Sequence, residues 1–84
     1  MKMKPKEKLA SREVDGKLYI VDIEDETLHA FNPSAALIWD GIKKGHNREK
    51  IVSRLADEFE VAEAAAMKDA EEFIGTLIKR GLIK

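Results

Sequence analysis

The sequence predicts an α+β domain in which a three-stranded antiparallel meander precedes three helices, an order that is winged helix-turn-helix-like. Short β-branched and aromatic segments alternate with turn residues as far as residue 31. At Asn32-Pro33 the spacing of apolar residues changes to that of helices, and it stays helical as far as Arg80. Strands followed by helices are typical of α+β proteins rather than of alternating α/β folds.

The first two strands are predicted at residues 9–14 and 18–23, joined by Asp15-Gly16. Asp-Gly supplies the positive φ angles that a two-residue type I′ turn needs at both central positions. The segment 18–23 is apolar on both faces, which suits a central strand. After the charged tip Glu24-Asp25-Glu26, residues 27–31 are expected to return as the third strand. The first and third strands then form the two edges of the sheet.

Three helices are predicted from their capping residues and stops. Asn32-Pro33 can cap and open the first helix, and Asn47 can cap the second. The third helix is expected to begin at residues 61–62, to run to residue 80 and to stop at Gly81. Trp39 lies beside the apolar face of the first helix and is expected to be largely buried.

The composition bounds the possible classes of function. A chain of 84 residues forms one domain with one modest core. The absence of cysteine excludes disulfides, thiolate metal sites and a cysteine nucleophile, and it fits a reducing, cytoplasmic compartment. We find no membrane-spanning or signal segment, so no membrane partner is expected. A formal net charge of -1 gives little attraction to a nucleic-acid backbone.

Residues 1–8 carry four lysines and one glutamate. This segment is expected to be a flexible basic tail in solvent, ahead of a single domain at residues 9–84.

The residue types that commonly perform chemistry form no recognisable constellation. Asp22 and the acidic residues 24–26 lack the glycine and distal glutamate of a calcium loop, which favours a charged hairpin tip. His29 and His46 lie on different elements without a third ligand. No serine has an elbow motif or a paired base. We therefore expect no catalytic activity, no metal and no cofactor.

The third predicted strand is an unusual edge. Residues 27–31 contain no charged side chain in a chain that is 37% charged, whereas the first strand carries Arg12 and Glu13. Natural edge strands are blunted by charge or proline, because an open edge pairs with other chains. A neutral edge beside a long helix is suited to strand addition, in which a peptide pairs with the edge and places side chains in the neighbouring groove.

Two other functions remain open. In a winged-helix DNA-binding protein the third helix would enter the major groove, although its N-terminal half is acidic, with Glu63, Asp69, Glu71 and Glu72. A small dimerisation module could instead use the same edge on itself. We expect a monomer that forms some dimer at high concentration through the third strand.

Three segments resemble the PqqD-like family, also called RiPP recognition elements: LHAFNPSAALIWDGI, REKIVSRLADEFEV and DAEEFIGTLIKRGLI. Their similar features are an apolar-Asn-Pro step before a helix with Ile-Trp, a helix that ends near Phe-x-Val, and a final Asp-x-x-x-Phe-Ile-x-x-Leu-Ile. The resemblance covers roughly residues 14–83. It implies a non-enzymatic chaperone that binds the leader of a ribosomally made precursor peptide. The family presents that leader to a modifying enzyme, often a radical S-adenosylmethionine enzyme with iron–sulfur clusters.

Carried over residue by residue, the resemblance implies mostly structural roles for Asn32, Trp39, Asp69, Phe73, Leu77, Gly81 and Leu82. It also implies a peptide surface along the third strand and beside the third helix. The pathway stays open between pyrroloquinoline quinone (PQQ) biosynthesis, lasso peptides and other modified peptides. The expected peptide-binding residues are Thr27, Leu28, His29, Ala30, Phe31, Ala64, Met67, Glu71 and Ile74.

Overall fold

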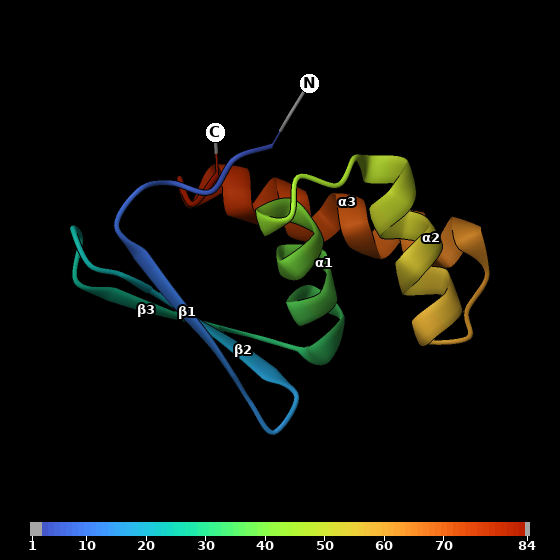
Figure 1. Cartoon of the computed structure of the whole chain (residues 1–84), viewed down its shortest axis with the longest axis horizontal. Helices are drawn as coiled ribbons and strands as arrows, with labels where there is room; N and C mark the ends of the chain where they lie inside the picture. Colours follow the sequence, from blue (N-terminus) through green and yellow to red (C-terminus); the bar gives the residue numbers. More distant parts are fainter. Residues whose placement is uncertain (1–2, 84) are drawn as a thin grey trace.

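The structure, a computed structural model, describes residues 3–83 of the chain. Three antiparallel strands precede three helices (Figure 1), so the predicted α+β fold and element order are confirmed. The elements are β1 (Leu9–Val14), β2 (Lys17–Asp22), β3 (Thr27–Phe31), α1 (Pro33–Lys43), α2 (Arg48–Glu58) and α3 (Glu63–Lys79).

The sheet has the order β1-β2-β3, with β2 in the centre. At the β1–β2 turn, Asp15 and Gly16 have φ angles of 51° and 80°, as a type I′ turn requires. In the β2–β3 register, Leu18 lies opposite Phe31 and Ile20 lies opposite His29. Opposite residues of an antiparallel pair share a face of the sheet. Phe31 and His29 therefore lie on the same face as the buried side chains of Leu18 and Ile20.

On one face of the sheet α1 packs against the central strand β2, and α2 and α3 pack against α1 and against each other (Figure 1). Asn32 and Asn47 cap α1 and α2 by accepting backbone N–H hydrogen bonds from Ala35 and Lys50, as their positions in the sequence predict. Gly41 inside α1 lets α2 approach closely, because a β-carbon there would lie 2.7 Å from Ile51 Cγ1. The core contains side chains from the sheet, from the three helices and from residues 82–83. Its largest buried side chains include Trp39, Ile20, Ile38, Ile42, Ile51, Leu55, Leu77 and Leu82.

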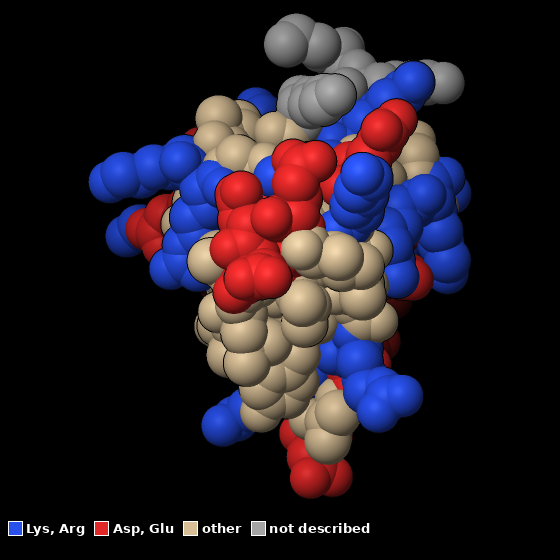
Figure 2. All heavy atoms as spheres, turned by 90° about the vertical axis from the view of Figure 1, so that its left-hand side faces the viewer, with Lys and Arg blue, Asp and Glu red and all other residues tan. Residues whose placement is uncertain are grey.

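The other face of the sheet is open. Val21 and Leu28 lie opposite each other in the register, and their side chains are 39% and 66% exposed. Figure 2 shows the left-hand side of the view in Figure 1. Acidic side chains gather there above a band of uncharged ones. The apolar character of both faces of β2 therefore reflects a central strand, as predicted, but only one of its faces is covered.

Residues 5–8, which we call the N-terminal strap, are held against the domain. Pro5 forms a β-bridge with Ile83, and the Lys6 N–H donates to the Leu82 carbonyl over 2.8 Å. The Lys8 carbonyl accepts the Ile23 N–H over 3.0 Å. The prediction of a solvated tail is therefore wrong for residues 5–8. Residues 1–2 lie outside the described part of the chain.

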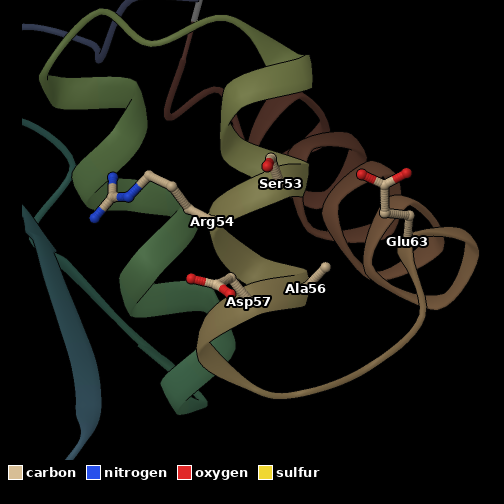
Figure 3. A pocket seen from close by; sticks show the side chains of 5 residues that line it. All are labelled: Ser53, Arg54, Ala56, Asp57 and Glu63. Atoms are coloured by element: carbon tan, nitrogen blue, oxygen red, sulfur yellow. The ribbon is translucent and has the colours of Figure 1, made fainter.

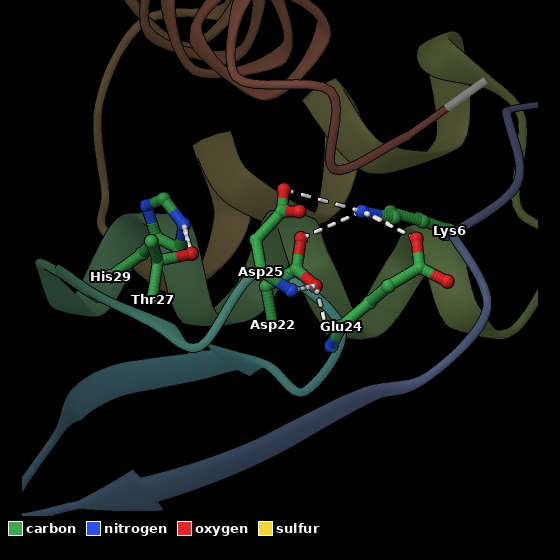
Figure 4. A network of polar contacts seen from close by, with 6 residues as sticks. All are labelled: Lys6, Asp22, Glu24, Asp25, Thr27 and His29. Carbon is green, nitrogen blue, oxygen red and sulfur yellow. Dashed lines mark hydrogen bonds and ion pairs between the residues drawn. The ribbon is translucent and has the colours of Figure 1, made fainter.

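The strap is anchored by Lys6, whose ammonium group lies among three carboxylates (Figure 4). Lys6 Nζ is 2.9 Å from Asp22 Oδ2 and 3.6 Å from carboxylate oxygens of Glu24 and Asp25. Asp22 is 2% exposed and also accepts the backbone N–H groups of Glu24 and Asp25. Asp22 is thus a buried anchor rather than part of a solvated tip, and the acidic cluster surrounds the chain's own cation.

The environment of this pair stabilises both charges. The hydrogen bond from Lys6, and then the backbone N–H of Asp25, hold the pKa of Asp22 below its ordinary value of 3.8 despite burial. The hydrogen bond to Asp22 raises the pKa of Lys6 above 10.5. A lowered carboxyl pKa stabilises the fold above the ordinary pKa, and this stabilisation disappears as pH falls through the folded-state value. The raised lysine pKa stabilises the fold below 10.5 and is lost as pH rises through its folded-state value.

We predict that the free energy of unfolding declines as pH falls below 3.8, and that Asp22→Asn removes part of this decline. Urea melts from neutral to acid pH measure the effect. Glu26→Gln, in the same turn but outside the Lys6 cluster, is the matched control and should leave the pH profile unchanged. Parallel profiles for the wild type and Asp22→Asn would contradict the role of this pair.

Trp39 generates a second stability prediction. Its side chain is 2% exposed, which confirms its predicted burial, and its Nε1 has no hydrogen-bond partner among residues 3–83. Trp39→Ala should cost about 3–5 kcal/mol in denaturant melts, because it leaves a cavity in the core. Trp39→Phe keeps an aromatic ring without the unpaired N–H and should cost less. A loss below ~1 kcal/mol for the alanine variant would be inconsistent with this packing.

Candidate functional site

The outer edge of β3 is open. Within the described residues β3 pairs with β2 alone, so its other edge leaves main-chain N–H and C=O groups without strand partners. Thr27, Leu28 and Ala30 are exposed, whereas His29 and Phe31 are half-buried against the helices. The structure therefore places all five predicted β3 residues along an uncharged edge. Such an edge is a template for pairing with another strand.

The inner face of β3 meets α3 through a small aromatic and cationic cluster. The Phe31 and Phe73 rings pack edge to face, with centroids 4.9 Å apart and an interplanar angle of 79°. The Arg80 guanidinium lies 5.3 Å from the centroid of the Phe31 ring, and its Nη1 is 3.3 Å from His29 Nδ1. His29 Nε2 in turn lies 3.2 Å from Thr27 Oγ1, a pair drawn in Figure 4. These contacts tie β3 to the C-terminal half of α3 and leave the strand edge free.

A hollow of about 400 Å³ lies beside this cluster, and we call it the β3–α3 groove. It is lined by the end of β3, the start of α1 and one face of α3. Its α3 residues recur at helical spacing, so they belong to one face of that helix. The residues that line the groove are Ala30, Phe31, Asn32, Ser34, Ala35, Asp69, Glu72, Phe73 and Thr76.

The predicted α3 residues do not line this groove. Ile74 is 2% exposed and packs in the core, so its side chain cannot contact a peptide. Met67 is exposed, but it precedes Thr76 by nine residues, which at about 100° per residue places it on roughly the opposite side of the helix. Ala64 and Glu71 are also exposed without lining the groove. The α3 residues that line the groove include Phe73 and Thr76 instead, so the face of α3 beside β3 is rotated relative to the predicted surface.

The charged residues that line the groove are both acidic, Asp69 and Glu72. Arg80 does not line the groove and lies beside His29 and over the Phe31 ring. Within residues 3–83, neither acid forms an ion pair with a lysine, arginine or histidine within 4.0 Å. A ligand in the groove therefore meets two aromatic rings and two carboxylates, and Arg80 lies next to the groove, over the Phe31 ring.

His29 and His46, which the sequence places on different elements, also lie apart in the structure. His46 Nδ1 lies 3.2 Å from Arg54 Nη1, at the α1–α2 connection, whereas His29 lies on β3. Desolvation, followed by the charges of Lys50 and Arg54, lowers the pKa of His46 below 6.5. No group of three potential His, Cys, Asp or Glu ligands occurs within residues 3–83. His46 therefore has a structural contact with Arg54.

Another hollow, of about 420 Å³, lies between α2 and the start of α3 (Figure 3). It is lined by Ser53, Arg54, Ala56, Asp57 and Glu63. Arg54 turns away from it, toward α1.

Arg54 reaches the Asp40 carboxylate, with Nη2 3.4 Å from Oδ2. Burial raises the pKa of Asp40, but hydrogen bonds from Lys44 and Arg54 outweigh it and hold the value below 3.8. Arg54 thus joins α1 to α2, and nothing in the hollow pairs a nucleophile with a base in the way that catalysis requires.

No helix within residues 3–83 combines the length and apolar character needed to cross a bilayer.

Comparison with known proteins identifies relatives of the whole fold. The family model described as "Coenzyme PQQ synthesis protein D (PqqD)" matches residues 17–83. A solved structure described as TbiB1 in complex with the TbiA(beta) leader peptide is 20% identical, with a TM-score of 0.87 over 96% of this chain and 94% of that chain. Another, described as lasso peptide synthetase B1 complexed with the leader peptide, is also 20% identical. Its TM-score is 0.89 over 100% of this chain and 99% of that chain. No curated protein matches the sequence.

Proposed function

The chain belongs to the PqqD family, and on this premise we propose that it is a non-enzymatic peptide chaperone. It binds the leader segment of a ribosomally synthesised precursor peptide as an added strand on β3, and it presents that peptide to a modifying enzyme. One observation supports this proposal above the others: β3 is an uncharged, unpaired edge beside a groove that is already open. Main-chain hydrogen bonds then provide affinity, and the groove selects alternate side chains.

The comparisons support a leader as the class of ligand. Both solved structures are described as complexes with leader peptides, and both share this fold over nearly the whole chain. The fold alone would not distinguish a peptide-binding protein from others of the same architecture. The proposal therefore depends on the family and on the chemistry of the β3 edge taken together.

The geometry divides the side chains of an added strand into two sets. Successive side chains of a strand point to opposite faces of the sheet. One set would face α3 and meet Phe31, Phe73 and Thr76 in the groove. The other set would extend the open face of the sheet next to Leu28. A bound leader thus keeps half of its side chains available to a second protein, which suits a chaperone that presents its ligand.

The proposed partners follow from the family resemblance. The modifying enzyme is proposed to be of the radical S-adenosylmethionine kind, and the chaperone itself to be cytoplasmic and to need no cofactor. The chain is proposed to be a monomer that forms dimers at high concentration through the β3 edge, in competition with the leader.

The DNA-binding alternative gains no support from α3. The acidic residues Glu63, Asp69, Glu71 and Glu72 are all exposed on this helix, where a reading helix needs cationic or neutral groups.

We predict that Thr76→Arg weakens peptide binding at least tenfold, about 1.4 kcal/mol, because it places bulk and charge where apolar side chains enter the groove. The probe is a synthetic peptide of about twelve residues, enough to pair along β3 and extend past it, selected on the wild-type chain from a random phage-displayed library. Calorimetric titration measures its affinity for each variant.

Met67→Arg is the matched control, since it makes the same kind of change on the far side of the same helix. It should leave the affinity unchanged. If Met67→Arg abolished binding and Thr76→Arg preserved it, the peptide would lie on the opposite face of α3 and the proposed site would be wrong.

A further inference from the structure

A second hollow adjoins the β3–α3 groove beyond the end of β3. It has a volume of about 370 Å³ and lies where the start of α1, the end of α2 and the start of α3 meet. We call it the distal hollow. Its apolar walls are Leu55, Phe59 and Val61, and Pro33 also lines it.

The two hollows adjoin at the start of α1. Asn32, Ser34 and Asp69 line both of them, so these three residues form the border between the groove and the distal hollow. The side chains of Asn32 and Ser34 are already hydrogen-bonded to each other, Ser34 Oγ donating to Asn32 Oδ1 over 2.9 Å. A peptide that leaves the end of β3 would reach the distal hollow by crossing this border, where Asn32 and Asp69 are exposed and Ser34 is half-buried.

Two of the apolar walls of the distal hollow, Phe59 and Val61, are exposed, whereas Leu55 is buried. Phe59 and Val61 are 40% and 41% exposed. The Phe59 N–H donates to the Leu55 carbonyl, and the Val61 N–H donates to the Ala56 carbonyl, each over 3.1 Å. These bonds fix the connection between α2 and α3, so the two side chains form a preformed apolar surface. Preformed apolar surfaces bind apolar groups without a cost for ordering the protein.

The junction between the two hollows is negatively charged. Asp69 lies at the shared wall, and Glu72 lies one helical turn further along the groove. Both are exposed, and neither is paired with a cationic side chain within residues 3–83. A ligand group at this point would therefore be favoured if it were cationic, and disfavoured if it were anionic.

We propose that the peptide path extends past β3 into the distal hollow, and that the chain prefers peptides with a cationic residue between two apolar anchors. This inference deepens the proposed function and rests on it. The first anchor packs on Phe31 and Phe73, the Lys or Arg side chain faces Asp69, and the second anchor enters the hollow beside Phe59 and Val61.

The test is selection from the random phage-displayed library on the wild-type chain and on Asp69→Lys. Peptides enriched on the wild type should carry Lys or Arg between two apolar positions. Peptides enriched on Asp69→Lys should carry Asp or Glu at the same position. The side chain of Asp69 is exposed, so the substitution does not disturb the core.

The distal anchor is tested by affinity. Val61→Asp should weaken binding of an enriched peptide at least tenfold, and it should not affect a version of that peptide whose distal apolar residue is replaced by glycine. Val14→Asp is the matched control, because Val14 is similarly exposed (44%) on β1 and should have no effect on either peptide.

The outcomes distinguish this inference from the proposed function. If enriched peptides lose binding on Thr76→Arg but ignore both Asp69→Lys and Val61→Asp, the extended path is wrong and strand addition on β3 stands. If no enriched peptide is sensitive to Thr76→Arg, the β3–α3 groove is not the peptide site, and the extended path is wrong with it.

Discussion

Phe31 and Phe73 meet edge to face with their ring centroids 4.9 Å apart, and this contact sets the separation of β3 and α3. The main packing of α3 is against α2 and α1 rather than against the sheet. The aromatic pair, together with Arg80 over the Phe31 ring, therefore supplies the principal contact between strand and helix. Closer packing would fill the groove with the chain's own side chains. Without the contact, the groove would lose its aromatic lining.

The N-terminal strap also helps to hold β3 and α3 in their relative positions. Lys6 pairs with the acids of the β2–β3 turn, while Pro5 and the Lys6 backbone pair with residues 82–83, just after α3. The strap thus connects the turn that precedes β3 to the end of the helix that faces it. A groove held at both its middle and its end needs little rearrangement to accept a peptide, and a preorganised site loses less free energy to ordering on binding.

Local sequence signals predicted the elements well, because each signal acts through neighbouring residues. Asp15-Gly16 specifies its turn through φ angles, and Asn32 and Asn47 specify helix starts through hydrogen bonds to residues three positions on. The uncharged β3 edge was also predictable, because residues 27–31 contain no charged side chain whereas 37% of the chain is charged.

The rotation of α3 and the docking of the strap were not predictable in the same way. Phe73 and Met67 flank the core stripe of α3 on different sides, and periodicity does not say which side faces β3. That choice depends on how the helices pack. Lys6 similarly lies in a basic segment whose composition predicts a solvated tail. Its partner Asp22 is sixteen residues away in the sequence, and only the fold brings the two together. The residues most relevant to the groove were those positioned by contacts between distant segments.

Amide hydrogen exchange with and without the selected peptide tests strand addition most directly. An added strand pairs with main-chain groups that alternate along β3, so exchange should slow at alternate residues within 27–31. The amides of β1, the other edge of the sheet, should exchange at unchanged rates. Slowed exchange along β1, with β3 unaffected by a peptide that binds, would contradict pairing at the β3 edge.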